Sequence, residues 1–344
     1  MYIDAHVHLR DFKQAHKETV KHGLEVARDS GVDAVFDMPN TDPPLTTRDL
    51  VVERLKLAEE ANVPEVFYGL HIGLTADSEQ VKQAVDICRE FKNVVGIKLY
   101  AGHSVGNLGV TKQEDQQMIY EILAKEGYTG VLVVHAEKES FIRSSLWDPS
   151  KPITHCDVRS EEAEVASVLD QLWLSYLAKF KGKLHITHIS SPIAVAMVNE
   201  AKLEGRDVSC SVCPHHFIYN RDQMNIYNGI LWKMNPPLRR PKARLELLKF
   251  LESGEIDWID TDHAPHTLEE KIKLPFMSGI PGLPYWPLFE RYLRSKDFTE
   301  EQIKKLTFLN ASDRYGLNIL RSRRSIKDRT ADYSFNPYSS LEVK

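Results

Sequence analysis

The chain has 344 residues, 42% hydrophobic and 27% charged, with a formal net charge of −5 at pH 7. Acidic and basic residues are interspersed along most of it, which argues against a broad nucleic-acid-binding face. The sequence has only four cysteines, which argues against a disulfide framework, and no apolar leader precedes the first predicted strand, which argues against secretion. It has no apolar run of about 18 residues, which argues against a membrane span. We therefore expect a cytoplasmic protein.

Eight short apolar, β-branched segments recur along the chain, as expected of buried strands. They begin at Tyr2, Asp33, Glu65, Val94, Gly130, Leu184, Val208 and Ile256. Segments with helical periodicity follow them, at His16–Ser30, Thr47–Asn62, Ser78–Phe91, Lys112–Glu126, Glu161–Lys179, Pro192–Glu204, Pro241–Ser253 and Thr299–Leu309. This alternation predicts a parallel sheet, and eight units predict a (β/α)8 TIM barrel. The alternative, an open doubly wound sheet, normally has a Gly-rich phosphate turn after its first strand, and HVHLRD is not one.

The predicted domain organisation is one catalytic barrel, residues 1–320, and a C-terminal tail, residues 321–344. Two connections are unusually long, from His135 to the helix near Glu161 and from Asp262 to the helix near Thr299. Long loops in a compact barrel tend to carry function. The basic cluster near the start of the tail is interpreted as solvated surface, with an RNA- or membrane-binding tail as the alternative.

Metal-binding residue types recur where the predicted strands end. In a strand, residues two apart share a face, so His6 and His8 lie together, with Arg10 two positions further on. Barrel enzymes place their chemistry at the carboxyl ends of the strands. The residues of metal-binding or metal-bridging type there are His6, His8, Lys98, His135, His188 and Asp262. A single histidine on such a strand is more often a core residue, so the metal hypothesis depends on their convergence.

Lys98 needs a separate argument, because a free ammonium is costly to bury and repels a metal. Pairing with Asp4 or Asp260 is one interpretation. The other is that burial lowers the lysine pKa, so that the neutral amine reacts with carbon dioxide to give a carbamate. A carbamate is an anion whose two oxygens can bridge two cations.

Three neighbouring features receive structural interpretations. His185 lies on the opposite face from His188, and Asp260 lies a layer deeper than Asp262. The stretch CSVCPHH, which holds Cys210, Cys213, His215 and His216, resembles half of a zinc finger but lacks a second pair at finger spacing.

Taken together, these motifs resemble those of the dihydroorotases of the amidohydrolase superfamily. They are HVHLR (6–10), MPNT (38–41), GIKLY (96–100), VHAE (134–137), THIS (187–190), PHH (214–216), NPPLR (235–239), TDHAPHTLEEK (261–271) and GIPGL (279–283). They cover nearly the whole predicted barrel in family order.

The resemblance implies a binuclear zinc site. His6 and His8 would bind the more buried zinc with Lys98 and Asp262, and His135 and His188 would bind the second. A carbamylated Lys98 and a hydroxide would bridge the pair, with Asp262 as the catalytic proton shuttle. The resemblance also implies substrate-binding residues: Arg10, Asn40 and His266 for a carboxylate, and Asn235 and the backbone near Gly282 for the ring.

The implied reaction is the reversible cyclisation of N-carbamoyl-L-aspartate to L-dihydroorotate and water in pyrimidine biosynthesis. Two alternatives stay open: another cyclic amidase, allantoinase- or dihydropyrimidinase-like, and a catalytically inactive assembly partner. The sequence departs from relatives that carry a glutamate at the position of Ser211 for an additional zinc, so only two metals are expected. The N-terminal part of the usual small β-sandwich is also absent, and the tail is a candidate remnant of it.

The remaining expectations concern a loop and the partners. AGHSVGNLG (101–109) suits a mobile lid over the substrate. The expected partner is a small-molecule substrate, with no nucleic acid and no membrane. The sequence leaves open a homodimer or an association with another enzyme of the pyrimidine pathway.

Overall fold

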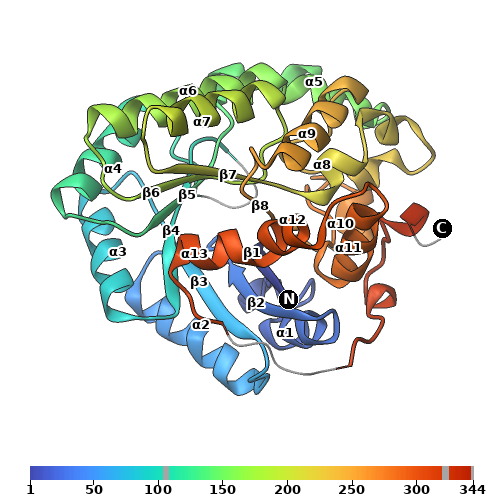
Figure 1. The fold of residues 1–344 in the computed structure, drawn as a ribbon, viewed down its shortest axis with the longest axis horizontal. Helices are drawn as coiled ribbons and strands as arrows, with labels where there is room; N and C mark the ends of the chain where they lie inside the picture. The colour runs from blue at the N-terminus through green and yellow to red at the C-terminus, as the bar shows by residue number, and fades with distance from the viewer. Residues whose placement is uncertain (104–107, 320–324, 342–344) are drawn as a thin grey trace.

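The structure, a computed structural model, describes residues 1–103, 108–319 and 325–341. Eight parallel strands follow one another around a barrel in chain order. They are β1 (Tyr2–Val7), β2 (Val32–Asp37), β3 (Phe67–Gly73), β4 (Val94–Tyr100), β5 (Val131–His135), β6 (Lys183–Ile186), β7 (Val208–Val212) and β8 (Trp258–Ile259). A parallel bridge between Val7 and His263 joins the first strand to the segment after the last. Figure 1 shows the strands enclosed by helices, so the predicted (β/α)8 barrel is confirmed.

Burial on both faces explains why these segments form strands. Every residue of β1, β2, β5 and β7 is buried. One face packs inside the barrel and the other packs against helices, so the strands are apolar without strict alternation. Polar residues interrupt this pattern mainly near the carboxyl ends, where the candidate site residues lie.

The crossover helices confirm the predicted periodicity, with ends that differ by a few residues. They are α1 (Val20–Asp29), α2 (Arg48–Ala61), α3 (Ser78–Glu90), α4 (Gln113–Lys125), α6 (Glu161–Leu177), α7 (Pro192–Leu203) and α9 (Pro241–Ser253). The largest difference is in α1, which was expected to begin at His16. The Thr19 side chain accepts a hydrogen bond from the backbone N–H of His22, and this N-cap sets the start of the helix at Val20.

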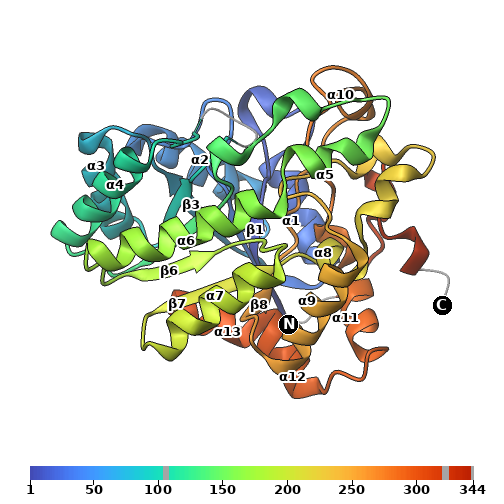
Figure 2. The same ribbon diagram turned by 90° about the horizontal axis from the view of Figure 1, so that it is seen from above.

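Short helices occupy segments that the sequence analysis treated as loops. They are α5 (His155–Val158), α8 (Pro214–Ile218), α10 (Leu268–Ile272) and α11 (Trp286–Arg294). The last predicted helix is instead α12 (Glu300–Lys304), a π-helical turn (Lys305–Leu309) and α13 (Asn310–Tyr315). Figure 2 shows α12 and α13 at one end of the barrel and α5 and α10 at the other. Among the described residues, no helix has the length and apolar character needed to cross a bilayer.

The described part of the tail, residues 325–341, packs back on the barrel. The backbone N–H of Lys327 donates to the carbonyl of Asp29 at 2.8 Å, and the Tyr333 hydroxyl donates to Glu18 at 2.9 Å. Tyr338 is fully buried in the main hydrophobic core. Within 325–341 the structure has 3-10 turns and no strand. The domain boundary near residue 320 and the sandwich-remnant hypothesis stay predictions.

Candidate active site

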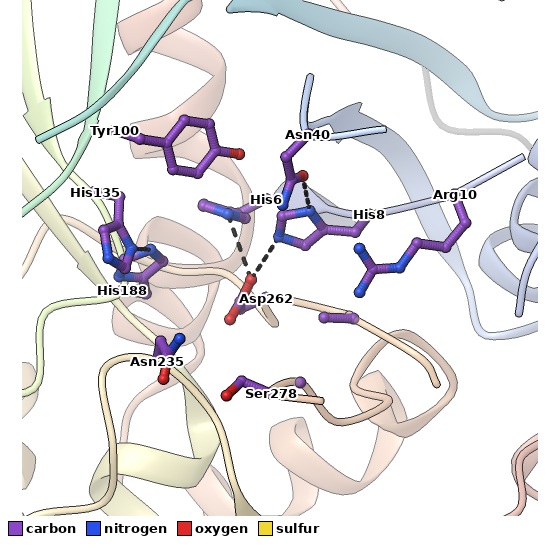
Figure 3. Close-up of a pocket in the computed structure, with 12 residues that line it drawn as sticks. His6, His8, Arg10, Asn40, Tyr100, His135, His188, Asn235, Asp262 and Ser278 are labelled. Atoms are coloured by element: carbon purple, nitrogen blue, oxygen red, sulfur yellow. Dashed lines mark hydrogen bonds and ion pairs between the residues drawn. The ribbon is translucent and has the colours of Figure 1, made fainter. Parts of the chain in front are cut away.

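A polar pocket opens where the carboxyl ends of the strands meet, and Figure 3 shows its side chains converging from several strands. Its lining residues are His6, His8, Arg10, Asn40, Tyr100, His135, His188, Asn235, Asp262, Ala264, Ser278 and Gly279. Eight of the eleven predicted site residues are among them. The other three, Lys98, His266 and Gly282, lie outside this lining.

Two histidines at the carboxyl end of the first strand meet the loop after the last strand. One oxygen of Asp262 lies 2.9 Å from Nε2 of His8 and 3.4 Å from Nε2 of His6. The opposite nitrogen of His8 lies 2.6 Å from Oδ1 of Asn40, and that of His6 lies 2.6 Å from the hydroxyl of Thr187. These outer contacts orient both imidazoles toward the carboxylate.

The end of the fifth strand and the segment after the sixth contribute a second pair of histidines. Nδ1 of His135 lies 3.1 Å from Nε2 of His188, and the His188 ring is 5.0 Å from that of His6. On its other side, Nε2 of His135 lies 3.0 Å from a carboxylate oxygen of Glu137, which is paired with Arg159. Burial raises the pKa of Glu137, but the charge of Arg159, the contact with His135 and the charge of Arg239 together outweigh this effect and lower the pKa to about 2.

Lys98 is fully buried on β4, and its ammonium nitrogen has no hydrogen-bond partner among the described residues. This nitrogen lies 5.0 Å from the centre of the Tyr100 ring. Burial lowers the pKa of Lys98 to about 7, although the charge of Asp262 opposes the shift. A substantial fraction of the amine is therefore neutral near pH 7, as the carbamate hypothesis requires.

The same groups fit divalent cations better than they fit one another. Burial lowers the pKa of His6, His8, His135 and His188, so the imidazoles are neutral and offer lone pairs. When Nδ1 of His8 donates to Asn40, its Nε2 carries a lone pair that faces a carboxylate oxygen of Asp262 at 2.9 Å. Two acceptors in contact repel, whereas a cation held by both turns the contact into coordination. Ligand atoms of His6, His8 and Asp262 all lie within 4.8 Å of one another.

Arg10 presents a buried positive charge to the pocket. Its side chain is fully buried, and its Nε and Nη1 have no hydrogen-bond partner among the described residues. Its Nη2 lies 3.2 Å from Nε2 of His266, which also lies 3.0 Å from the carbonyl of Ser278. A neutral imidazole nitrogen either donates to the carbonyl or accepts from the guanidinium, so Arg10 lacks a full set of acceptors.

Backbone strain accompanies three of these side chains. Arg10, His188 and Asp262 have φ values of 49°, 42° and 47°, in the left-handed region that side chains other than glycine rarely adopt. Such strain persists where the surroundings impose it, and it concentrates at functional sites. Nothing in the sequence indicated it.

Of the two residues predicted to contact the substrate ring, Asn235 lines the pocket and Gly282 does not in the described structure. Asn235 lines the pocket, and its Oδ1 lies 3.0 Å from Nε2 of His155. Gly282 does not reach the pocket lining in the described structure: its N–H donates to His263, and its carbonyl accepts from Tyr285. Gly279 lines the pocket instead.

The sequence analysis missed four lining residues: Tyr100, Ala264, Ser278 and Gly279. Tyr100 had a signal, because it lies two positions after Lys98 in a strand and shares its face. Ser278 had none, since a bridge between His263 and Ile280 brings its loop to the pocket, whereas Gly279 opens the GIPGL motif noted in the sequence.

Three residues set aside as structural are buried beneath or beside the site. Both ring nitrogens of His185 contact serine hydroxyls of β7, and the ring stacks on Trp258 with 4.0 Å between centroids. Asp260 contacts the sulfur of Cys213 at 3.4 Å, and burial raises the pKa of this carboxyl to about 8.

The lid hypothesis concerns residues 101–109, of which 104–107 lie outside the described residues. Gly102 is required there, because a Cβ would lie 1.9 Å from the carbonyl oxygen of Glu137.

No family model matches the chain. It is 31% identical over 333 residues to a dihydroorotase of Methanosarcina mazei, spanning 92% of this chain and 70% of the relative. A dihydroorotase of Brevibacillus brevis is also 31% identical, over 92% of this chain and 73% of the relative. An allantoinase of Deinococcus radiodurans is 30% identical, over 92% of this chain and 70% of the relative.

Two solved structures show the same fold. An L-hydantoinase from Arthrobacter aurescens has a TM-score of 0.82 at 23% identity, covering 92% of this chain and 70% of that one. A dihydroorotase from Saccharomyces cerevisiae, in complex with 5-fluoroorotic acid, has a TM-score of 0.75 at 20% identity, covering 92% and 84%. The barrel, with histidines and an aspartate at its strand ends, is that of the amidohydrolase superfamily. Within that superfamily, the chain belongs to the cyclic amidohydrolases, in the family that contains the dihydroorotases.

Proposed function

We propose that this chain is a dihydroorotase, which interconverts N-carbamoyl-L-aspartate and L-dihydroorotate plus water. The observation that carries the proposal is the buried guanidinium of Arg10, two of whose donor nitrogens have no partner in the described part of the chain, in the pocket that holds the histidine and aspartate cluster. Both compounds carry a carboxylate that Arg10 would bind in bidentate geometry. Asn40 and His266, which lie next to this pocket wall, would complete the carboxylate site.

The metal assignment also belongs to this proposal. His6, His8, Lys98 and Asp262 would hold one zinc ion, and His135 and His188 the other. Carbamylation would join the Lys98 amine to the carbon of carbon dioxide with loss of one proton, leaving an anion suited to both ions. Two such ions would lower the pKa of a bound water and polarise the scissile carbonyl.

The chain's own residues would position the substrate and move the proton. Arg10 would fix the carboxylate, and Asn235 would contact the ring from the opposite side of the pocket, as its place in Figure 3 allows. In hydrolysis, Asp262 would take a proton from the attacking water and deliver it to the leaving ring nitrogen. Cyclisation would use the same group in reverse order.

The competing function is that of another cyclic amidase, which the similarity to an allantoinase supports. Allantoin and dihydrouracil have no carboxylate, so either substrate would offer no carboxylate to the unpaired nitrogens that Arg10 shows among the described residues. An inactive assembly partner is the third hypothesis, although all six candidate metal ligands are present.

A cytoplasmic location, a homodimer and an association with another pyrimidine-pathway enzyme also stay predictions.

A direct comparison of substrates tests the proposal. The zinc-loaded protein is assayed with dihydroorotate, N-carbamoyl-L-aspartate, allantoin and dihydrouracil under the same conditions. We expect turnover of the first two and a kcat/KM for dihydroorotate far above those for allantoin and dihydrouracil. A higher kcat/KM for allantoin or dihydrouracil would assign the competing function, and no turnover of any substrate by metal-replete protein would support the inactive partner.

A further inference from the structure

A second cluster of metal-binding side chains lies where β7 ends and α8 begins. It consists of Cys213, His215 and His216, which we call the Cys-His-His corner. Each of the three residues is at least 97% buried. The cysteine sulfur and one nitrogen from each imidazole all lie within 4.8 Å of one another. None of the three is among the six candidate ligands of the catalytic pair.

In the corner, one nitrogen of each imidazole makes no hydrogen bond to the described residues and is available to bind a metal. Nδ1 of His215 lies 3.3 Å from the hydroxyl of Tyr338, and Nε2 of His216 lies 3.1 Å from the carbonyl of Pro236. The other nitrogen of each ring, Nε2 of His215 and Nδ1 of His216, is buried without a hydrogen-bond partner among the described residues. An unpaired buried nitrogen is costly, and two in adjacent rings 4.3 Å apart call for a shared explanation.

A bound cation supplies that explanation. The two outer contacts fix the ring orientations, as contacts to the second nitrogen do in zinc sites generally. The Cys213 sulfur also lies 3.4 Å from Oδ1 of Asp260, but Asp260 is not part of the cluster whose ligand atoms all lie within 4.8 Å of one another. One thiolate and two imidazoles, completed by a water, form a donor set that suits tetrahedral zinc.

We propose that the Cys-His-His corner binds a further zinc ion with a structural role. On binding, the Cys213 thiol would release its proton to solvent and the thiolate would bond to the metal. Because His215 contacts Tyr338, the ion would tie the corner of β7 and α8 to the C-terminal tail. This differs from the zinc-finger interpretation of CSVCPHH, since Cys210 is not part of the cluster and the sequence spacing alone was uninformative.

Cobalt substitution gives a test that does not depend on enzyme activity. Thiolate bound to Co²⁺ gives a charge-transfer band in the near ultraviolet, and the candidate catalytic ligands include no sulfur. We expect the full-length wild-type protein to show this band with the intensity of about one thiolate-bound Co²⁺ per chain, while further Co²⁺ fills the catalytic pair without adding to it. We expect Cys213→Ser to lose the band and to bind about one zinc ion fewer per chain than the wild type.

Cys210→Ser is the matched control, because Cys210 is equally buried on the same strand but lies outside the cluster. It should keep both the band and the zinc content. Absence of the band in the wild type, or equal zinc content in the wild type and Cys213→Ser, would overturn the proposal. A band without an additional ion would make Cys213 a ligand of the catalytic pair and would also overturn it.

If Cys213→Ser fails to fold, the wild-type spectrum and the wild-type zinc count decide. A thiolate band together with one ion more than the catalytic pair supports the corner, and either one missing refutes it. The proposal does not rest on the dihydroorotase assignment. Failure of that assignment would change the substrate profile and leave the thiolate band unaffected.

Discussion

At the scale of single residues, the candidate site depends on a few buried groups whose contacts are incomplete without ligands. The carboxylate of Asp262 faces two imidazoles, and among the described residues the amine of Lys98 and two of the three guanidinium nitrogens of Arg10 have no hydrogen-bond partner. Each is costly to bury alone, so their presence in one pocket is better explained by function than by stability.

Asp262→Asn should separate metal binding from proton transfer. The amide keeps the shape and one oxygen donor but cannot accept the proton from the attacking water. We expect kcat to fall by about 10²- to 10⁴-fold, while part of the zinc content is retained. Steady-state assays with zinc analysis check this, and a near-normal kcat in the zinc-loaded variant would exclude the proton-shuttle role.

Arg10→Met should act on substrate binding. Removing a charge-assisted pair worth about 1.5–3 kcal/mol would lower kcat/KM for dihydroorotate by about 10- to 100-fold, mainly through KM. Arg10→Lys is the control, since it keeps the charge without the bidentate fork and should lose less. An unchanged KM in Arg10→Met would contradict the proposed carboxylate contact.

The placement of side chains in the pocket could be predicted where one strand face carries the signal. His6 and His8 share a face at the carboxyl end of β1, and Tyr100 could have been added from its spacing to Lys98. The placement could not be predicted where the loop after β8 folds back, since no local pattern indicates that Gly279 lines the pocket while Gly282 contacts His263. The roles assigned to the site residues stay predictions.

At the scale of elements, the tail contributes to the core of the barrel. The Tyr338 ring packs against Phe289 with 4.7 Å between centroids and against Tyr285 at 4.9 Å. A segment that sequence analysis treated as an appended tail is thus partly a packing element, although its composition is polar.

Tyr338→Ala should therefore destabilise the whole chain. Truncation of a fully buried aromatic ring costs about 3–5 kcal/mol, and we expect a lower thermal midpoint. Tyr227→Ala is the matched control, because Tyr227 is 92% exposed. Equal midpoints for the two variants, measured by calorimetry or circular dichroism, would show that the tail does not stabilise the barrel.

The success of helix prediction followed the strength of local signals. The bounds of α9 were predicted correctly, since Pro241 begins the helix and Gly254, with φ of 78°, ends it. The helix α11 was missed although it has an apolar face, because its start, Leu283 to Trp286, lacks a side-chain cap and follows an irregular loop.

At the scale of the whole molecule, barrel closure explains why the site was predictable at all. His6 and Asp262 are separated by most of the chain, yet the parallel bridge from Val7 to His263 places them together. Once eight strands are recognised, the carboxyl ends must meet, and the polar residues at those ends follow.

Metal removal should act on both activity and stability. Dialysis against a chelator should abolish activity and lower the thermal midpoint by about 5 °C or more, since ions that bind only the folded state stabilise it. Zinc with bicarbonate should restore activity faster than zinc alone, because Lys98 must form a carbamate. The bicarbonate effect should be absent in Lys98→Met, and equal recovery with and without bicarbonate in the wild type would contradict the carbamate.

The most direct measurement is an anomalous diffraction map at the zinc edge, from crystals grown with zinc and bicarbonate. We predict two peaks in the space between two pairs of histidines, His6 with His8 and His135 with His188. Density that extends from the Lys98 nitrogen should join the two peaks. An unmodified Lys98 and no anomalous peak beside these four histidines would contradict the account.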